Sequence, residues 1–150
     1  MPRACKLDRI EDCISFMVAK AAQQVTRRAR ELLAPFGVTP VQYAVLKVLS
    51  GTEGMSGAEI GARMVLDGAS VTGIVDRLEA LGLLERRADP KDRRTLRIVA
   101  TPRADDLMAA MDSAMDRLNA EAVAVLGRKD REFVQRLRQL GDERRWKGHV

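Results

Sequence analysis

Residues 86–100 decide the fold: Arg86-Arg87-Ala88-Asp89-Pro90-Lys91-Asp92-Arg93-Arg94-Thr95-Leu96-Arg97-Ile98-Val99-Ala100. A charged turn that contains a proline separates Arg86-Arg87 from the alternating stretch 95–100, and this pattern predicts a β-hairpin. The segment from Arg86 to Arg103 holds seven Lys or Arg and two Asp, a surplus of five that equals the formal net charge of +5. Charge confined to one hairpin indicates a surface for a polyanion.

Size and composition favour a single helix-rich domain over residues 1–150. Only 3% of the residues are aromatic, so aliphatic side chains must fill the core. The sequence has no apolar run long enough for a membrane span, and charges interrupt the N-terminus where a signal peptide would be apolar. We therefore expect a cytoplasmic protein with no membrane partner. Cys5 and Cys13 are too few for a disulfide framework and should be reduced thiols.

The residue types that most enzymes use are scarce. The one histidine, His149, is next to the C-terminus, so neither a catalytic triad nor a zinc site is expected. The glycines at 51, 54, 57 and 61 lack the spacing of a phosphate-binding loop. The sequence predicts no enzyme activity, no metal and no cofactor.

Apolar periodicity and capping patterns predict three helices before residue 66. The first runs from about residue 7 to residue 33 and ends at Pro35 and Gly37, with these apolar positions: Leu7, Ile10, Ile14, Met17, Ala21 and Val25. Thr39-Pro40-Val41-Gln42 forms a capping box for a second helix that ends near residue 49. Ser56-Gly57-Ala58-Glu59 repeats this pattern for a third helix through about residue 65. Asp67-Gly68 should turn the chain.

The fourth predicted helix has one apolar and one polar face, and Gly82 ends it. Its apolar face contains Val71, Ile74, Val75, Leu78 and Leu81, and its polar face contains Ser70, Thr72, Gly73, Asp76, Arg77 and Glu79. A helix, a short turn, a helix and a basic hairpin follow one another in the order of a winged helix-turn-helix. An inert α+β unit would give the same order. Small polar donors followed by a cationic hairpin favour the DNA-binding interpretation.

Two helices are expected after the hairpin, separated near Gly127. The first begins at Thr101-Pro102 and has apolar residues three and four positions apart, namely Met108, Met111, Met115, Leu118, Ala122 and Val125. This seam suits either a partner helix or an intramolecular core. Phe133, Leu137 and Leu140 mark the last helix. The sequence thus predicts a mainly α protein with a small β-hairpin wing (α+β).

Four stretches, in order, resemble the MarR family of bacterial winged-helix regulators. They are Gly37–Tyr43 with Leu46 and Leu49, Ser56–Ile60, Val71–Glu79 with Gly82-Leu83, and Arg86–Thr95. The resemblance implies a winged helix-turn-helix core at about 38–101, flanked by dimerisation helices at about 7–34 and 102–146. It further implies a homodimer on double-stranded DNA at an imperfect palindromic operator, with recognition helices in major grooves and wings toward minor grooves.

Within this resemblance, two groups of residues are candidate DNA contacts. Ser70, Thr72, Gly73 and Arg77 lie on the predicted recognition helix, where hydroxyls can reach base edges or phosphates and glycine allows close approach. Lys91, Asp92, Arg93 and Arg94 form the wing tip, and Asp92 and Arg94 resemble the family's paired acid and arginine. Such a pair would aim the arginine at a narrow minor groove. The alternative is a solvated ion pair of little energetic value.

The family also implies a small-molecule effector, usually one that releases a repressor from DNA. The resemblance places its crevice among the first, second and fifth helices. Met17, Phe36 and Tyr43 would offer apolar wall, while Arg27, Arg28 and Arg30 would receive an anionic group. Each of these residues could instead belong to the core or the surface. An aromatic carboxylate or its coenzyme A thioester would be typical.

Two alternatives to a ligand-responsive repressor remain open. Some family members sense peroxide through a cysteine early in the first helix, but Ser15 aligns nearest that position, so Cys13 is expected to be a buried, inert thiol. A winged-helix module that binds a protein through its fourth helix is the other alternative.

Overall fold

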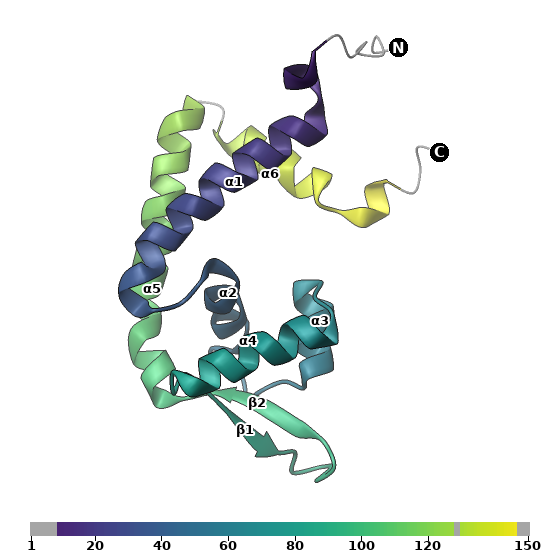
Figure 1. Ribbon diagram of the computed structural model, residues 1–150, viewed down its shortest axis with the longest axis vertical. Helices are drawn as coiled ribbons and strands as arrows, with labels where there is room; N and C mark the ends of the chain where they lie inside the picture. The colour runs from purple at the N-terminus through teal and green to yellow at the C-terminus, as the bar shows by residue number, and fades with distance from the viewer. Residues whose placement is uncertain (1–8, 128–129, 147–150) are drawn as a thin grey trace. The chain divides into compact units, whose positions relative to one another are not determined.

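The computed structural model describes residues 9–127 and 130–146, so Cys5, Leu7 and His149 lie outside the described residues. The described chain forms helices of different lengths and one β-hairpin (Figure 1). The elements are η1 (Ile10–Asp12), α1 (Ile14–Leu33), η2 (Ala34–Phe36), α2 (Pro40–Leu49), α3 (Gly57–Met64), α4 (Gly68–Ala80), β1 (Leu84–Ala88), β2 (Leu96–Ala100), α5 (Pro102–Leu126), α6 (Asp130–Leu140) and η4 (Glu143–Arg145), where η denotes a 3-10 helix. The expected fold class, mainly α with a small β wing, is confirmed. The chain divides into two compact units between Met115 and Asp116.

The first helix starts later than its apolar spacing predicted. Residues 10–12 form the 3-10 turn η1, Cys13 is extended with φ −74° and ψ 120°, and α1 begins at Ile14. Ile10 and Ile14 remain exposed, so no packed face supports a continuous helix here, and most helical stability in proteins comes from such packing. The predicted end is confirmed, because α1 stops at Leu33 and Gly37 adopts φ +71° after η2.

Both predicted capping boxes form. The Thr39 N–H donates to Gln42 Oε1 at 2.8 Å, and the Gln42 N–H donates to Thr39 Oγ1 at 3.3 Å. At α3 the Ser56 N–H donates to Glu59 Oε2 at 2.7 Å, and the Glu59 N–H donates to Ser56 Oγ at 3.2 Å. These reciprocal bonds satisfy backbone donors that a helix start leaves without partners. They therefore set where α2 and α3 begin.

Asp67 and Gly68 start α4 instead of forming a separate turn, which corrects the expectation from the sequence. Asp67 is the N-cap, and its Oδ1 accepts from the Ser70 N–H at 2.8 Å. Aspartate is a preferred N-cap because its carboxylate accepts from the free N–H groups of the first turn. The chain turns two residues before Asp67, at Val65, the C-cap of α3 with φ +55°.

The wing is an antiparallel hairpin that projects beyond α4 in Figure 1. Leu84 is paired with Ala100, and Ala88 with Leu96. Met55 adds a bridge on the other side of β2: its N–H donates to the Ile98 carbonyl at 3.0 Å, and the Ile98 N–H donates to the Met55 carbonyl at 2.7 Å. The wing is thus joined to the loop before α3 by backbone hydrogen bonds.

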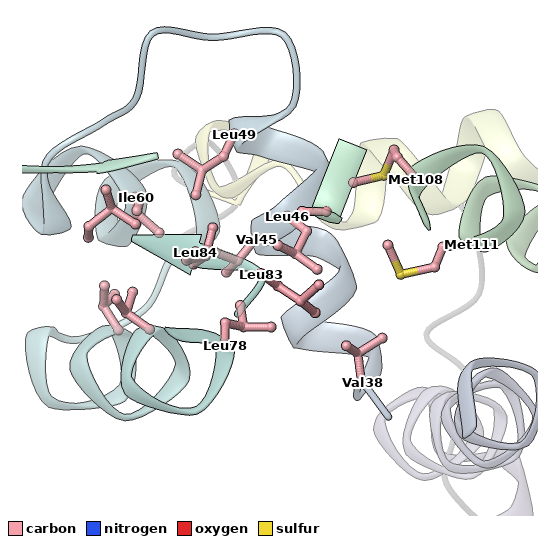
Figure 2. Packing of buried hydrophobic residues seen from close by; sticks show 14 of the residues in the cluster. Val38, Val45, Leu46, Leu49, Ile60, Leu78, Leu83, Leu84, Met108 and Met111 are labelled. Carbon is pink, nitrogen blue, oxygen red and sulfur yellow. The ribbon is translucent and has the colours of Figure 1, made fainter. Parts of the chain in front are cut away.

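The core of the first unit lies around α2 (Figure 2). Leu46 and Leu49 of α2 are fully buried, as are Leu78 of α4 and Met111 of α5. The methionine seam is therefore divided: Met108 and Met111 pack inside their own chain, whereas Val125 is exposed. For the first half of α5, the intramolecular alternative is correct. This packing holds the base of α5 against the winged-helix core.

The second unit contains the end of α5 together with α6 and η4. Side chains 131–139 of α6 are all exposed, including Phe133 and Leu137. The Trp146 Nε1–H donates to the Leu140 carbonyl at 2.9 Å and so closes the C-terminal end of α6. Within the described residues of this unit, the apolar side chains Phe133, Val134 and Leu137 of α6 are therefore uncovered.

Within the described ranges no single helix is both long and apolar enough to cross a membrane, although Ile14–Phe36 and Pro40–Leu49, bent by 67°, meet the length and composition requirement as a pair.

Gly54 should be required for a stable wing. It has φ +98°, and a Cβ there would lie 2.8 Å from the Ile98 carbonyl oxygen. Gly54→Ala should lower the free energy of unfolding by about 3 kcal/mol, as measured by urea denaturation. Gly51→Ala is the matched control, because Gly51 has φ +72° but no atom within 4 Å of its Cβ position. The control should cost about 1 kcal/mol, and equal losses would contradict the steric explanation.

Candidate nucleic-acid interface

The recognition-helix candidates are all on the exposed side of α4. Val71, Val75 and Leu78 are buried against the core, whereas Ser70, Thr72, Gly73 and Arg77 are exposed. Burial of one apolar stripe therefore orients the helix so that its polar residues face outward. The structure places the four predicted residues on one element, available to an external partner.

The two hydroxyls of α4 donate their protons within the protein. Ser70 Oγ donates to Asp67 Oδ2 at 2.8 Å, and Thr72 Oγ1 donates to the Gly68 carbonyl at 2.9 Å. A hydroxyl that donates in this way keeps lone pairs that accept. In this conformation Ser70 and Thr72 thus suit base-edge amino groups, which adenine and cytosine present in the major groove. The sequence alone did not indicate this orientation.

Asp67 shapes the start of the same helix. Its carboxylate accepts from the Ser70 N–H and the Ser70 hydroxyl, each at 2.8 Å. These hydrogen bonds, chiefly the one from the backbone, lower the pKa of Asp67. The first turn of α4 therefore carries a fixed negative charge at neutral pH, next to the residues proposed to meet bases.

Gly73 is not required by packing. A Cβ added at this exposed helical position would have no atom within 4 Å, and the residue lies within α4, where glycine is unfavourable. Packing and backbone geometry give no reason for its presence. Close approach of an external partner to the helix backbone is a reason that fits.

The wing tip is formed by Lys91, Asp92, Arg93 and Arg94, all exposed. Asp92 Oδ1 accepts from the Arg94 N–H at 3.0 Å, and Asp92 Oδ2 accepts from the Thr95 hydroxyl at 3.3 Å. Asp92 thus fixes the tip through the backbone of Arg94. In the described part of the chain no ion pair joins the Asp92 and Arg94 side chains, unlike the pairing that the resemblance implied.

Three other cations of the hairpin segment are bound by protein. The Arg86 guanidinium contacts Glu79 and lies 2.5 Å from Asp76 Oδ1, both on α4, and Arg87 pairs with Glu85 on its own strand. The two contacts of Arg86 hold β1 to α4 and raise the pKa of Arg86, with the hydrogen bond to Asp76 as the main cause.

Arg97 is the third of these cations. It pairs with Asp89 at 3.3 Å, and its Nη2 donates to the Gly54 carbonyl at 2.5 Å. Sequence reasoning named Lys91, Arg93 and Arg94 as DNA contacts but missed the protein partners of Arg86 and Arg97. For Arg86, the spacing of Asp76 and Glu79, three residues apart on one helix face, was the available signal.

Most of the residues expected around an effector crevice are paired with Glu31 or packed against the core. Arg27 and Arg28 both pair with Glu31, at 3.0 and 2.8 Å. Phe36 and Tyr43 pack against the core, whereas Met17 and Arg30 are exposed on α1. An anionic ligand at Arg27 or Arg28 would therefore compete with Glu31.

Tyr43 belongs to a polar contact that sequence reasoning did not find. The Tyr43 hydroxyl donates to Asp112 Oδ1 at 2.8 Å, and Lys47 Nζ donates to Asp112 Oδ2 at 2.6 Å. Both donors lie on α2, and Asp112 lies on α5. The hydrogen bond from Lys47, followed by the one from Tyr43, lowers the pKa of Asp112. A single carboxylate thus connects the core of the winged helix to α5.

Cys13 is partly exposed, so the expectation of a buried thiol was wrong. It occupies the N-cap of α1, and its Sγ lies 3.0 Å from the Ser15 hydroxyl oxygen. The Ser15 hydroxyl, and then the backbone N–H groups of Phe16 and Ser15, lower the pKa of the thiol. The late start of α1 explains the error. A continuous helix from residue 7 would have placed Cys13 in a middle turn, whereas Cys13 lies at the end of α1 as its N-cap.

Comparison with known proteins places residues 36–95 within the model of the MarR family. The transcriptional regulator TtmR of Methylorubrum extorquens is 39% identical over 103 residues, which cover 69% of this chain and 53% of TtmR. The chain thus spans about half the length of this relative, and its alignment with a second curated relative spans 62% of that protein.

Solved structures of similar proteins share the fold over most of the chain. A probable transcriptional regulator from Pseudomonas aeruginosa is 28% identical with a TM-score of 0.81, and the match covers 89% of this chain and all of that one. CouR from Rhodococcus jostii RHA1, bound to p-coumaroyl-CoA, is 26% identical with a TM-score of 0.80, over 95% of this chain and 99% of CouR.

The contact between α2 and α5 should make stability depend on pH. Because the pKa of Asp112 is lower in the folded state, its contribution is complete above the ordinary aspartate value of about 4 and is lost as the pH falls through the folded value. Asp112→Asn should therefore lower the free energy of unfolding at pH 7, and the difference from the parent should shrink in acid.

Urea denaturation over a pH series measures this difference. The matched control is Asp106→Asn, an exposed position on the same helix, which should stay near the parent throughout. A deficit of Asp112→Asn that is as large in strong acid as at pH 7 would show that the charge of Asp112 does not stabilise the fold.

Proposed function

The chain belongs to the MarR family, and we propose that it is a transcriptional regulator that binds double-stranded DNA as a homodimer. One observation carries the proposal: Arg86, Arg87 and Arg97 are paired within the protein, whereas Lys91, Arg93 and Arg94 are exposed together at the wing tip. Exposed cations on a projecting hairpin, in one unit with a polar helix face, suit a duplex with its phosphates and grooves.

The two elements have different tasks in this proposal. The N-terminal half of α4 enters a major groove, where Ser70 and Thr72 accept from bases, Gly73 allows close approach, and Arg77 reaches a phosphate or a guanine. The wing tip lies toward the adjacent minor groove, where Arg94 benefits from the negative potential. Lys91 and Arg93 then contact phosphates, and Asp92 keeps the turn in shape.

Exposed apolar residues support the homodimer. In α1 they include Ile14, Met17 and Val25, and in the second unit they include Phe133 and Leu137. Large exposed apolar faces on helices commonly mark protein interfaces. Two subunits related by a two-fold axis would bind two half-sites, so the operator is an imperfect palindrome.

We further propose repression that an anionic effector relieves, with an aromatic carboxylate or an acyl-CoA thioester as the chemical class. CouR, which is similar to this chain, is bound to p-coumaroyl-CoA in its structure. Met17, Phe36 and Tyr43 would contact the apolar part of the effector. Arg27 and Arg28 would release Glu31 and bind the anionic group of the effector instead. Because binding is reciprocal, the operator should weaken effector binding, and equal affinity for free and DNA-bound protein in calorimetry would rule out a tested compound.

A redox-sensing repressor is the second candidate, favoured by the partly exposed Cys13 and its lowered pKa. Its thiolate would attack a hydroperoxide, forming a sulfenic acid and releasing the corresponding alcohol. The third candidate is a winged-helix module that binds protein partners, and it predicts that the chain has no preference for any DNA duplex.

Arg94→Ala should weaken binding to the duplex upstream of the chain's own gene by about 1 to 3 kcal/mol, because it removes a groove cation. Random AT-rich DNA should share much of this loss. Thr72→Val, which keeps the shape but not the hydroxyl, should instead narrow the difference between operator and random duplex. Fluorescence anisotropy measures both affinities, and light scattering should give two chains per site.

Circular dichroism first establishes that each variant is folded. A folded Arg94→Ala variant that binds the operator as tightly as the parent at physiological salt would refute the role of the wing. A parent chain that binds all duplexes equally would refute the regulator itself.

Cys13→Ser separates the two signals. If the effector is a small molecule, Cys13→Ser should retain operator binding and release by that effector, and peroxide should change the operator affinity of the parent little. Loss of binding after mild peroxide treatment of the parent, absent in Cys13→Ser, would establish the redox candidate instead.

A further inference from the structure

Arg97 is a charged residue enclosed by the wing. Its side chain is 30% exposed, and that of its partner Asp89 is 15% exposed. The Arg97 Nε is buried and has no hydrogen-bond partner among the described residues. The guanidinium therefore faces the protein, in contrast to the cations of the wing tip, which are exposed.

The guanidinium joins two segments that are distant in sequence. Its Nη1 lies 3.3 Å from Asp89 Oδ2, and its Nη2 donates to the Gly54 carbonyl at 2.5 Å. Gly54 precedes Met55, whose backbone bridges Ile98. One side chain thus connects the end of β1 to the loop before α3, across 43 residues of sequence.

Asp89 extends this connection into the wing turn. Its other carboxylate oxygen accepts from the Lys91 N–H at 2.8 Å, and its own N–H donates to the Thr95 carbonyl at 2.9 Å. The hydrogen bond from Lys91 and the charge of Arg97 lower the pKa of Asp89. A continuous series of contacts therefore runs from the tip turn through Asp89 and Arg97 to Gly54.

Local charge is balanced without DNA. Arg97 is directly opposite Arg87 in the hairpin register, an arrangement that places two cations together. Glu85 pairs with Arg87, and Asp89 pairs with Arg97. The charge of Arg97 is thus neutralised without a phosphate. Its planar guanidinium reaches two acceptors at once, Asp89 and the Gly54 carbonyl, a geometry that lysine cannot reproduce.

We propose that Arg97 is a positioning residue that binds no DNA itself but fixes the wing relative to the helix-turn-helix, and thereby determines how well the operator is distinguished from other DNA. The proposal rests on the DNA-binding function proposed above. It assigns four of the seven cations of the segment to different tasks: Lys91, Arg93 and Arg94 meet the nucleic acid, while Arg97 with Asp89 sets their placement.

The decisive variant is Arg97→Lys, which keeps the charge but cannot bridge Asp89 and Gly54 together. We expect the operator affinity to fall roughly tenfold, a usual size for the loss of one coupling between neighbouring groups. Affinity for random duplex should stay within about twofold, because nonspecific binding depends on charge. The charge-conserving double variant Asp89→Asn with Arg97→Gln should behave in the same way.

Arg94→Ala is the control for a direct contact. It should weaken both duplexes and reduce the slope of log affinity against log salt by about one, whereas Arg97→Lys should keep the parent slope on random duplex. If Arg97→Lys binds the operator like the parent, or the double variant loses affinity equally on both duplexes with a smaller slope, Arg97 is only a charge or a phosphate contact.

Hydrogen exchange without DNA tests the connection separately. In Arg97→Lys the amides of Thr95, Asp89 and Met55 should exchange faster than in the parent, while amides of α2 should be unchanged. Unchanged exchange at the wing would overturn the proposal even if operator affinity falls. A parent chain that prefers no duplex would instead refute the proposed function, and exchange would still show whether Arg97 holds the wing.

Discussion

Helix α2 buries Val45, Leu46 and Leu49 completely, and the elements that face outward are built around this face. It packs against α1, α3 and β2, and a polar contact joins it to α5 through Asp112. Protein interiors are close-packed, so a helix in this place cannot shift without moving its neighbours. The direction of α4 and the base of the wing therefore depend on residues that never meet solvent.

The arginines of the wing differ in what they contact: some pair with acids of the protein and others are exposed. Arg86 and Arg97 each bind acids of the protein, one on α4 and one within the wing. Arg93 and Arg94 are exposed three and four residues after Pro90 of the wing turn. The placement of carboxylates decides the difference, since Asp76 and Glu79 of α4 face Arg86, and Asp89 faces Arg97. Net charge located the surface, and only the pairing shows which cations are available on it.

Features that depend on residues near in sequence could be predicted. The boxes at Thr39–Gln42 and Ser56–Glu59 span four residues each, and the proline turn with its alternating flank gave the hairpin. The outward position of Ser70, Thr72, Gly73 and Arg77 on α4 followed from one apolar stripe. Prediction from apolar spacing failed at Cys13. The spacing continues through this residue, but the helix is interrupted there because no packed surface supports it.

The remaining features depend on contacts between distant segments. Arg97 and Gly54 are 43 residues apart, and Tyr43 and Asp112 are 69 residues apart, so no spacing rule connects them. The seam of α5 had a period that fits an internal core and a partner helix equally, and Met111 proved to be core while Val125 remained exposed. Hydroxyl directions at Ser70 and Thr72 likewise depend on the capping geometry of α4.

The ion pairs of the wing consist of arginines with aspartates or glutamates. The hairpin, residues 84–100, contains no histidine, cysteine or tyrosine, and histidine is the side chain that ordinarily changes charge near neutral pH. The shape of the wing is consequently indifferent to proton concentration under physiological conditions. The shape of the wing depends instead on its packing, which joins β2 to α2 and, through the bonds of Tyr43 and Lys47 to Asp112, joins α2 to α5.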